Sequence, residues 1–380
     1  MMTDIIKSES GKEVNFLAIK DFAKVSIGEF VHKSKQNPSG KYPVYNGGTG
    51  NTGFYDEYNR TANKIIVSAR GANAGYVNRV FVDFWSGNSC YSIDVIDENV
   101  DWNYIYYCLK NGEVKLLGEQ QKGGIPAVSK KQVEQFKIPL PPLPIQQEIV
   151  RILDTFTNLT AELTAELTAR RKQYEYYRDE LLTFGEDVPK VSLSELARFT
   201  YGFTDKAKET GDTRFIRITD IDDNGNLRRS DAKYITLTEE SRKYLLKKGD
   251  ILLARTGATY GKTLYIPDDT PAVFASFLIK IELDNSRILN RYYWHFAKST
   301  QYWTQAEKYV SKAGQQQFNS KAVGRVLVPI PPLGVQQKIV DILDKFDKLC
   351  ADIGDGLPAE IEARQRQYEY YRGQLLKFDN

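Results

Sequence analysis

Cysteine and histidine are scarce in this sequence of 380 residues. The three cysteines, Cys90, Cys108 and Cys350, lack the paired spacing of a metal site, and the two histidines are His32 and His295. Neither a disulfide framework nor a zinc site is therefore expected, and no residue is assigned as a metal ligand. No run of 18 apolar residues occurs, and the N-terminal residues lack the basic-then-apolar order of a secretion signal. The expected location is the cytoplasm.

Motifs for catalysis are missing as well. GATYGKT at 257–263 has three residues between its glycines, whereas a phosphate-binding P-loop needs four. Its counterpart GANAGYV at 71–77 has no Lys-Thr pair. No N-P-P-[FYW] motif of a methyltransferase is present, and Lys280 does not belong to a nuclease-like D/E-x-K pattern. We therefore expect no catalytic residue and no cofactor in this chain.

Strong charge of one sign is also absent. The chain has 52 Lys and Arg against 49 Asp and Glu, which gives a net charge of +3. Hydrophobic residues make up 41% and charged residues 27%, proportions typical of a globular protein. A surface for nucleic acid would therefore depend on local clustering of Lys and Arg.

The sequence instead contains a repeat that covers the whole chain. QYEYYR at 173–178 returns at 367–372, and IPLPPLPIQQEIVRILDTFTNL at 138–159 aligns without a gap to VPIPPLGVQQKIVDILDKFDKL at 328–349. Weaker similarity continues upstream, where KIIVSARGANAG at 64–75 corresponds to DILLARTGATYG. Two copies are too few for a solenoid, and they indicate a monomer that imitates a two-fold dimer.

Each copy begins with a variable module of mixed α and β character. In module 1 (residues 1–140), runs 64–69 and 79–84 are expected as strands and 101–111 as a helix. In module 2 (residues 185–330), residues 290–303 are the expected counterpart of that helix. A short strand with a Pro-rich end closes each module, because proline stops sheet pairing.

Each copy ends with a helical segment whose sequence is similar in the two copies. Apolar residues recur at alternating steps of four and three in both segments, the pattern of a coiled-coil seam. In the first segment the seam comprises Ile145, Ile149, Ile152, Phe156, Leu159 and Leu163; after an extra step of four to Leu167 it resumes through Tyr174, Tyr177, Leu181 and Phe184. In the second it comprises Val335, Ile339, Ile342, Phe346 and Leu349. Residues 145–184 contain no Gly or Pro, which predicts one helix of about 60 Å with a stutter at TAELTAEL. Gly354, Gly356 and Pro358 predict a kink or a restart in the second segment.

The repeated hexapeptide allows two interpretations. Tyr174, Tyr177, Tyr368 and Tyr371 pack along a helix face, or they form a docking surface for another protein. Both can hold, since a shared hydrophobic seam can also seat partner helices.

Candidate DNA contacts gather in three places. The first is the pair of matched Gly-Ala-x-x-Gly turns, with Arg70 and Arg255 beside them, and the second is a pair of aligned loops, 120–130 and 309–321. The third is the basic stretches RFIRITD at 214–220 and NLRRSDAKY at 226–234. Arg, Gln and Asn read base edges, and Lys anchors phosphate. Plain turn geometry and ordinary surface exposure remain open as alternatives. The candidates are Arg70, Asn73, Lys122, Lys130, Arg214, Arg217, Arg228, Arg229, Arg255, Thr259, Tyr260, Lys262, Gln315, Gln316, Gln317 and Lys321.

The helical motifs, PLPPLPIQQEIVRILDTF, TAELTAEL and QYEYYRDELL with their second copies, resemble the specificity (S) subunits of type I restriction–modification systems. The likeness covers essentially the full chain. It implies an α+β fold with two homologous mixed α/β target recognition domains, separated by two long antiparallel helices in a coiled coil with internal pseudo-two-fold symmetry. The implied domains are 1–140, 141–184, 185–330 and 331–380.

The resemblance also implies a function. Each module reads one half of a bipartite DNA target, and the helices set the spacing and dock two methylation (M) subunits, with restriction (R) subunits in the full complex. The two TAEL units at 160–167 then correspond to one fixed gap. The partners use S-adenosylmethionine, ATP and Mg²⁺, and this chain is not an enzyme. The alternative is a coiled-coil adaptor whose modules bind protein without reading DNA.

Overall fold

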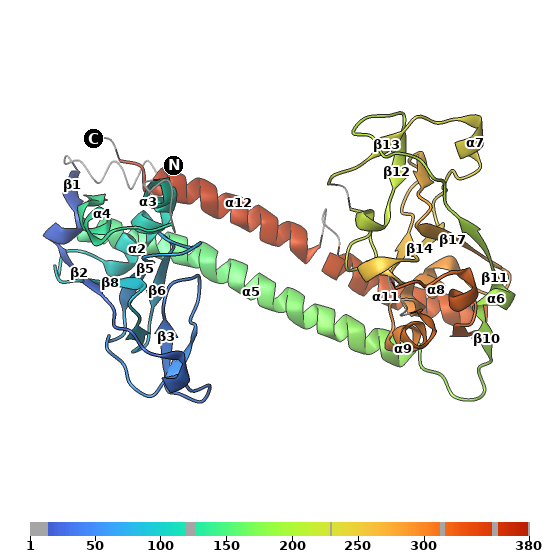
Figure 1. Ribbon diagram of the computed structural model, residues 1–380, viewed down its shortest axis with the longest axis horizontal. Coiled ribbons are helices and arrows are strands. Elements are labelled where there is room, and N and C mark those ends of the chain that lie inside the picture. Colours follow the sequence, from blue (N-terminus) through green and yellow to red (C-terminus); the bar gives the residue numbers. More distant parts are fainter. Residues whose placement is uncertain (1–13, 119–125, 229, 312–315, 352–355, 379–380) are drawn as a thin grey trace. The chain divides into compact units, whose positions relative to one another are not determined.

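The structure is a computed structural model, and it describes residues 14–118, 126–228, 230–311, 316–351 and 356–378 (Figure 1). The chain forms two compact units, residues 1–162 with 361–380, and residues 163–360. Each unit contains one module together with portions of the helical segments. No helix among the described residues is long and apolar enough to cross a membrane.

Unit 1 is built on an antiparallel sheet of four strands in the order β2-β8-β5-β6. A smaller sheet in the order β4-β3-β7 and the pair β1-β9 complete the β structure. Helix α2 begins where Asp101 accepts hydrogen bonds from the backbone N–H groups of Asn103 and Tyr104. The elements are β1 (Asn15–Ala18), β2 (Ala23–Ile27), β3 (Tyr42–Tyr45), β4 (Gly53–Tyr55), β5 (Lys64–Ser68), β6 (Val77–Val80), β7 (Trp85–Ser86), β8 (Cys90–Val95), α2 (Trp102–Asn111), α3 (Glu113–Gly118), α4 (Lys130–Gln135) and β9 (Lys137–Leu140).

Unit 2 repeats this plan. Its larger sheet has the order β11-β17-β14-β15, its smaller sheet has the order β13-β12-β16, and β10 pairs with β18. In both smaller sheets the central strand has one antiparallel and one parallel neighbour. The elements are β10 (Lys190–Ser192), α6 (Leu193–Leu196), β11 (Ala197–Tyr201), β12 (Thr213–Ile216), β13 (Tyr234–Ile235), α7 (Glu239–Arg242), β14 (Ile251–Ala254), β15 (Thr263–Tyr265), β16 (Ala272–Phe274), β17 (Leu278–Leu283), α8 (Asn290–Phe296), α9 (Thr300–Tyr309), α10 (Ser320–Val323) and β18 (Leu327–Pro329). The matching strand orders confirm the duplication.

Two expected elements differ from the structure. Residues 290–303 form two helices, because Ser299 caps the start of α9 by accepting from the Tyr302 N–H. The strand expected over 79–84 is β6, which starts earlier and ends at Val80. Val80 pairs with Lys64, the first residue of β5. Asn63, which precedes Lys64, has a φ of 59°, so β5 cannot extend further back and β6 has no partner beyond Val80.

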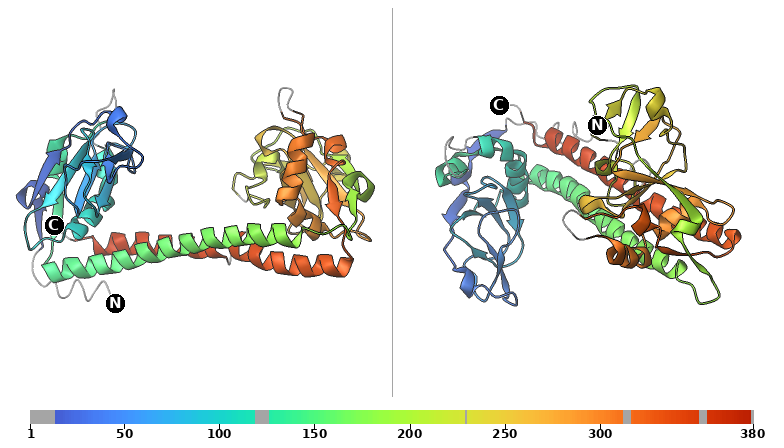
Figure 2. Two further views of the ribbon diagram at one scale, coloured as in Figure 1. Left: turned by 90° about the horizontal axis from the view of Figure 1, so that it is seen from below. Right: turned by 45° about the vertical axis from the view of Figure 1, so that its right-hand side comes forward.

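The first helical segment is the single helix α5 (Leu143–Leu181) of 39 residues, drawn in green in Figure 2, as expected. The second segment is interrupted. Helix α11 (Leu333–Ala351) ends before the glycines, and α12 (Leu357–Leu375) begins with Pro358 in its first turn, a position that tolerates proline. The restart predicted from Gly354, Gly356 and Pro358 is therefore confirmed, although Gly354 itself lies outside the described residues.

The Pro-rich motif before each helix serves to hold a buried glutamine. Gln146 accepts from the Asp101 N–H at 2.9 Å and donates to the carbonyls of Asn99 and Pro141. Gln336 accepts from the Leu289 N–H at 2.9 Å and donates to the carbonyls of Arg287 and Pro331. Both side chains are buried, so these hydrogen bonds tie the start of each long helix to its own module.

Candidate nucleic-acid interface

In module 1 the glycine turn after β5 lies against the loop that precedes α4. The Gly71 N–H donates to the Pro126 carbonyl at 2.9 Å, and the Val128 N–H donates to the Ala69 carbonyl at 2.9 Å. Gly71 and Gly75 have φ values of 88° and 89°, the left-handed conformation that glycine adopts without strain. The structure therefore joins two of the sequence-predicted regions into one surface.

Module 2 contains the same arrangement with different side chains. The Gly257 N–H donates to the Gln316 carbonyl at 3.1 Å, and the Phe318 N–H donates to the Arg255 carbonyl at 2.7 Å. Gly257 and Gly261 also have positive φ values, 68° and 80°. We call this feature the turn–loop assembly, formed by residues 69–75 with 126–130 in module 1 and by residues 255–261 with 316–321 in module 2.

The two arginines of these assemblies are not equivalent. The backbone hydrogen bonds place Ala69 where module 2 has Arg255, and Arg70 where module 2 has the buried Thr256. The sequence alignment without a gap already contains this shift of one residue. Because side chains in extended chain alternate between faces, Arg70 and Arg255 leave the backbone on opposite sides.

The other candidates near the assemblies differ in exposure. Lys130 is exposed and 3.3 Å from Glu134, whereas the Tyr260 ring packs edge-on against Trp303 and Phe318. The Thr259 hydroxyl donates to the Thr256 carbonyl. Arg70, Asn73, Gln317 and Lys321 are exposed, and Gln316 is partly buried. Lys122, Arg229 and Gln315 lie outside the described residues. The exposed polar side chains are the ones available for a ligand.

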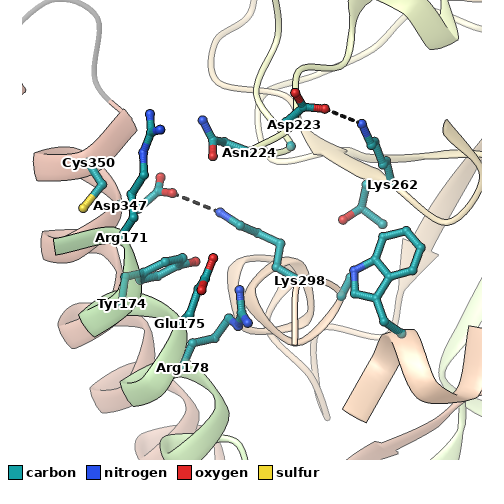
Figure 3. A pocket seen from close by; sticks show the side chains of 14 residues that line it. Arg171, Tyr174, Glu175, Arg178, Asp223, Asn224, Lys262, Lys298, Asp347 and Cys350 are labelled. Atoms are coloured by element: carbon teal, nitrogen blue, oxygen red, sulfur yellow. Dashed lines mark hydrogen bonds and ion pairs between the residues drawn. The ribbon is translucent and has the colours of Figure 1, made fainter. Parts of the chain in front are cut away.

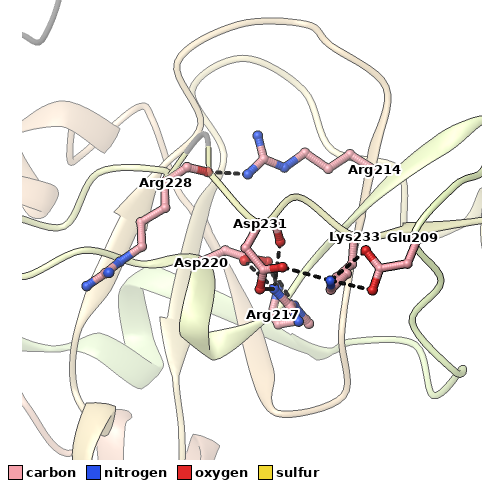
Figure 4. A network of polar contacts seen from close by, with 7 residues as sticks. All are labelled: Glu209, Arg214, Arg217, Asp220, Arg228, Asp231 and Lys233. Atoms are coloured by element: carbon pink, nitrogen blue, oxygen red, sulfur yellow. Dashed lines mark hydrogen bonds and ion pairs between the residues drawn. The ribbon is translucent and has the colours of Figure 1, made fainter. Parts of the chain in front are cut away.

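The basic segment of module 2 forms a network of its own (Figure 4). Arg217 lies 2.9 Å from Asp220 and 3.3 Å from Asp231, and hydrogen bonding to Asp220 raises the pKa of Arg217. Arg214 donates to the Arg228 carbonyl. Arg228 itself is exposed, and its guanidinium points away from the acidic residues in Figure 4. Arg228 is thus better placed than Arg217 to meet a phosphate.

A cavity of about 280 Å³ in unit 2 is lined by α5, α11 and module 2 (Figure 3). Its two lysines are matched by acids, since Lys262 lies 2.6 Å from Asp223 and Lys298 lies 3.0 Å from Asp347. Burial lowers the pKa of Lys298, and Asp347 opposes this shift. The paired charges make the cavity a polar contact between helix and module. Among the described residues, no group of three or more His, Cys, Asp or Glu could hold a metal ion.

A carboxylate on each long helix anchors the adjacent module. In unit 1, Asp154 accepts from Arg79 at 2.7 Å and from the Tyr107 hydroxyl at 2.6 Å. Burial is the largest single influence on Arg79 and disfavours its charge, but the hydrogen bond to Asp154 and the electrostatic attraction of Tyr107 and Asp154 together raise the pKa of Arg79. Asp154 therefore ties α5 to both β6 and α2.

In unit 2 the corresponding Asp344 lies 2.7 Å from Arg291 and 2.7 Å from His295 Nε2. His295 Nδ1 also lies 3.1 Å from the Tyr174 hydroxyl, so α5 joins the same contact. Burial lowers the pKa of His295 to about 4. His295 is therefore neutral at pH 7, and its tie to the helices is a hydrogen bond.

The predicted seam residues fall into three groups. Ile145, Ile149, Ile152, Leu167, Tyr174 and Ile339 are buried; Phe156, Leu159, Leu163, Leu181, Phe184, Phe346, Tyr368 and Tyr371 are partly buried; Tyr177, Val335, Ile342 and Leu349 are exposed, Ile342 to 41%. Leu153, Leu182 and Leu343 are fully buried yet were missed. They lie beside the a/d seam and face the modules, so a search for the wider apolar stripe of a core-facing helix would have found them.

Similarity to known proteins agrees with this architecture. Residues 11–170 and 185–363 match the family described as type I restriction modification DNA specificity domain. The chain is 32% identical to a Haemophilus influenzae protein named as a type I restriction enzyme specificity subunit, over 99% of this chain and 98% of the relative. It is 36% identical to the EcoR124I/EcoR124II specificity subunit of Escherichia coli, over 72% of this chain and 70% of that one.

A solved structure shows the same fold. The S subunit of the type I restriction–modification system from M. genitalium aligns over 97% of both chains with a TM-score of 0.66 and 20% identity. The family match covers both copies of the repeat, and the Haemophilus influenzae relative spans nearly the full chain. The chain therefore belongs to the DNA specificity subunits of type I restriction–modification systems.

Proposed function

We propose that the chain is the non-catalytic subunit that selects the DNA target, with each module reading one half of a bipartite sequence. The main support is that the turn–loop assembly occurs in both modules, on sheets with the same strand order, but with different side chains in each module. Because the backbone of the assembly is the same in both modules, each copy can contact DNA in the same way. Because the side chains differ, the base sequences of the two half-sites differ. An asymmetric target follows from this arrangement.

The exposed side chains supply the chemistry for such readout. Arg70 and Asn73 in module 1, and Gln317 and Lys321 in module 2, are exposed at the turn–loop assemblies. Arginine and amide side chains recognise purine edges in the major groove, and lysine neutralises phosphate. Lys130 lies at the assembly of module 1, Arg228 is a further exposed candidate in module 2, and Lys122, Arg229 and Gln315 remain candidates from the sequence.

The helices are proposed to seat two methylation subunits. Tyr176 and Tyr370 occupy matching places in the two hexapeptides and belong to neither seam. Each is 64% exposed. Two identical exposed aromatic residues fit two copies of one partner, since aromatic side chains are enriched where proteins bind each other. Restriction subunits complete the complex, and S-adenosylmethionine, ATP and Mg²⁺ are assigned to these partners.

Module exchange tests the proposal directly. Residues 1–140 are replaced by the corresponding module of another specificity subunit, and the complex with methylation subunits modifies a genome whose modified sites are then mapped. We expect one half-site to change and the other to persist. A change in both half-sites would show that the modules do not read independently.

Salt dependence separates DNA readout from a protein-binding adaptor. Each phosphate neutralised by Lys or Arg adds about 0.9 to the slope of log K against log salt, so a steep slope is expected for the complex with methylation subunits. A slope that Arg70→Ala and Lys321→Ala both leave unchanged in the full complex would favour the adaptor. The purified chain alone is expected neither to methylate nor to cleave DNA.

A further inference from the structure

Three residues meet at one edge of the larger sheet in module 2. Tyr201 is the last residue of β11, Arg255 directly follows β14, and Phe277 directly precedes β17. Strand β17 lies between β11 and β14 and is antiparallel to both. The end of β11, the end of β14 and the start of β17 therefore share one edge, although the residues are far apart in the sequence.

The guanidinium of Arg255 lies over two rings at this edge. Its central carbon lies 5.3 Å from the centroid of the Tyr201 ring and 5.6 Å from that of Phe277. Its Nε donates to the Ser276 carbonyl at 3.0 Å. A guanidinium has five N–H donors, so this arrangement orients the group while its two terminal nitrogens keep donors for a ligand.

The rings remain open to solvent and adjoin the turn–loop assembly. Tyr201 is 40% exposed and Phe277 is 51% exposed. The Tyr201 hydroxyl accepts from the Ser320 N–H at 3.2 Å and lies 3.0 Å from the Ser320 hydroxyl. Ser320 is the neighbour of Lys321 in sequence, so the rings and the candidate contacts of the loop belong to one surface.

Module 1 has the same backbone at this place without these side chains. The Ala69 N–H donates to the Ser89 carbonyl at 2.7 Å, as the Arg255 N–H donates to the Phe277 carbonyl at 3.1 Å. Strand β2 ends at Ile27, in the position of Tyr201. Module 1 thus places Ile27, Ala69 and Ser89 where module 2 has Tyr201, Arg255 and Phe277. The difference lies in side chains alone, as expected of a feature that distinguishes two readers.

We propose that Tyr201, Arg255 and Phe277 form a base-reading clamp of module 2, in which Arg255 donates two hydrogen bonds to N7 and O6 of a guanine in the DNA major groove. Tyr201 and Phe277 are positioning residues that hold the guanidinium plane and exclude water from it. An arginine fixed in advance loses less side-chain entropy on binding, and the fork geometry of its donors matches guanine. This inference rests on the proposed function of the modules.

The test uses complexes of the full chain with its methylation subunits and maps the modified sites. Arg255→Lys keeps the positive charge but removes the pair of parallel N–H donors. Discrimination between guanine and other bases at one position of the module 2 half-site is therefore expected to fall by about 5- to 150-fold. Phe277→Ala and Tyr201→Ala are expected to reduce discrimination at the same guanine. The module 1 half-site is expected to persist in every variant.

Arg198→Lys is the matched control, because Arg198 is an exposed arginine three residues before Tyr201 on β11 and therefore on the opposite face. It is expected to change nothing. Co-purification with the methylation subunits and an unchanged melting temperature establish that each variant is folded, and Arg255→Lys provides the mildest change.

Two results would overturn the clamp. Binding by Arg255→Lys and Phe277→Ala complexes with unaltered base preference would show that no base is read here, as would equal weakening on all sequences, the signature of a phosphate contact. If the unsubstituted complex modifies no bipartite site, the proposed function itself fails, and the clamp fails with it.

Discussion

The ring of Phe156 stacks on the ring of Tyr371, with centroids 5.3 Å apart and an interplanar angle of 21°. Phe346 and Tyr177, at the corresponding positions of the other copies, stack with centroids 5.7 Å apart and an angle of 26°. Each hexapeptide thus packs on the helix of the other copy. This reciprocal exchange is the contact pattern of a two-fold dimer, here made within one polypeptide.

The stacked pair predicts how replacing Phe156 by alanine changes the free energy of unfolding. Phe156→Ala removes a partly buried ring from the contact between α5 and α12, so a loss of about 2 kcal/mol is expected, below the 3–5 kcal/mol of a fully buried ring. Urea unfolding of the purified complex measures the loss. Phe30→Ala serves as the control, since Phe30 is 65% exposed and its removal should cost less than about 0.5 kcal/mol. Equal effects of the two substitutions would contradict the stacking role.

The buried glutamine near the start of each long helix predicts different effects for substitutions at Gln336 and at its neighbour Gln337. Gln336→Ala leaves the Leu289 N–H and two carbonyls without their partner in a buried site, which is expected to destabilise unit 2 by about 2–3 kcal/mol. Gln337→Ala changes an exposed side chain and should cost less than about 0.5 kcal/mol. The midpoints of denaturant unfolding compare the two variants. Similar midpoints would show that the buried hydrogen bonds contribute little.

The buried His295 predicts loss of stability in mild acid. Burial lowers its pKa to about 4, below the ordinary value of 6.5, so the unfolded chain binds the proton more readily than the folded one. The stability contribution is complete above pH 6.5 and is lost as the pH falls toward 4, by about 3 kcal/mol in total. Denaturant unfolding between pH 7 and pH 4.5 measures this slope. His295→Gln is expected to flatten it, and an unchanged slope in that variant would assign the acid sensitivity to other groups.

The TAEL repeat predicts a change in target spacing. Deleting Thr164–Leu167 shortens α5 by four residues, about 6 Å of helix, and is expected to shorten the unread gap while both half-sites persist. Mapping modified adenines in a genome that carries the complex gives the gap length. Thr164→Ala keeps the helix length and should keep the gap. A gap unchanged by the deletion would argue against the helix as a ruler.

Much of the candidate site could be predicted one piece at a time. The glycine turns were recognised because positive φ restricts the residue type, and the loops were recognised by their Gly, Lys and Gln content. That turn and loop join into one assembly could not be predicted, because the hydrogen bond from Gly71 to Pro126 links residues 55 positions apart.

The sequence by itself determined the duplication, the unbroken length of α5, the restart near Pro358 and the family, because these features depend on identity and periodicity along the chain. Only the tertiary structure decided that each glycine turn joins its loop and that Tyr201, Arg255 and Phe277 share an edge. The physical reason is the distance along the sequence between the residues that interact. A helix forms through hydrogen bonds four residues apart, whereas strand pairing and burial bring together side chains that no local pattern connects.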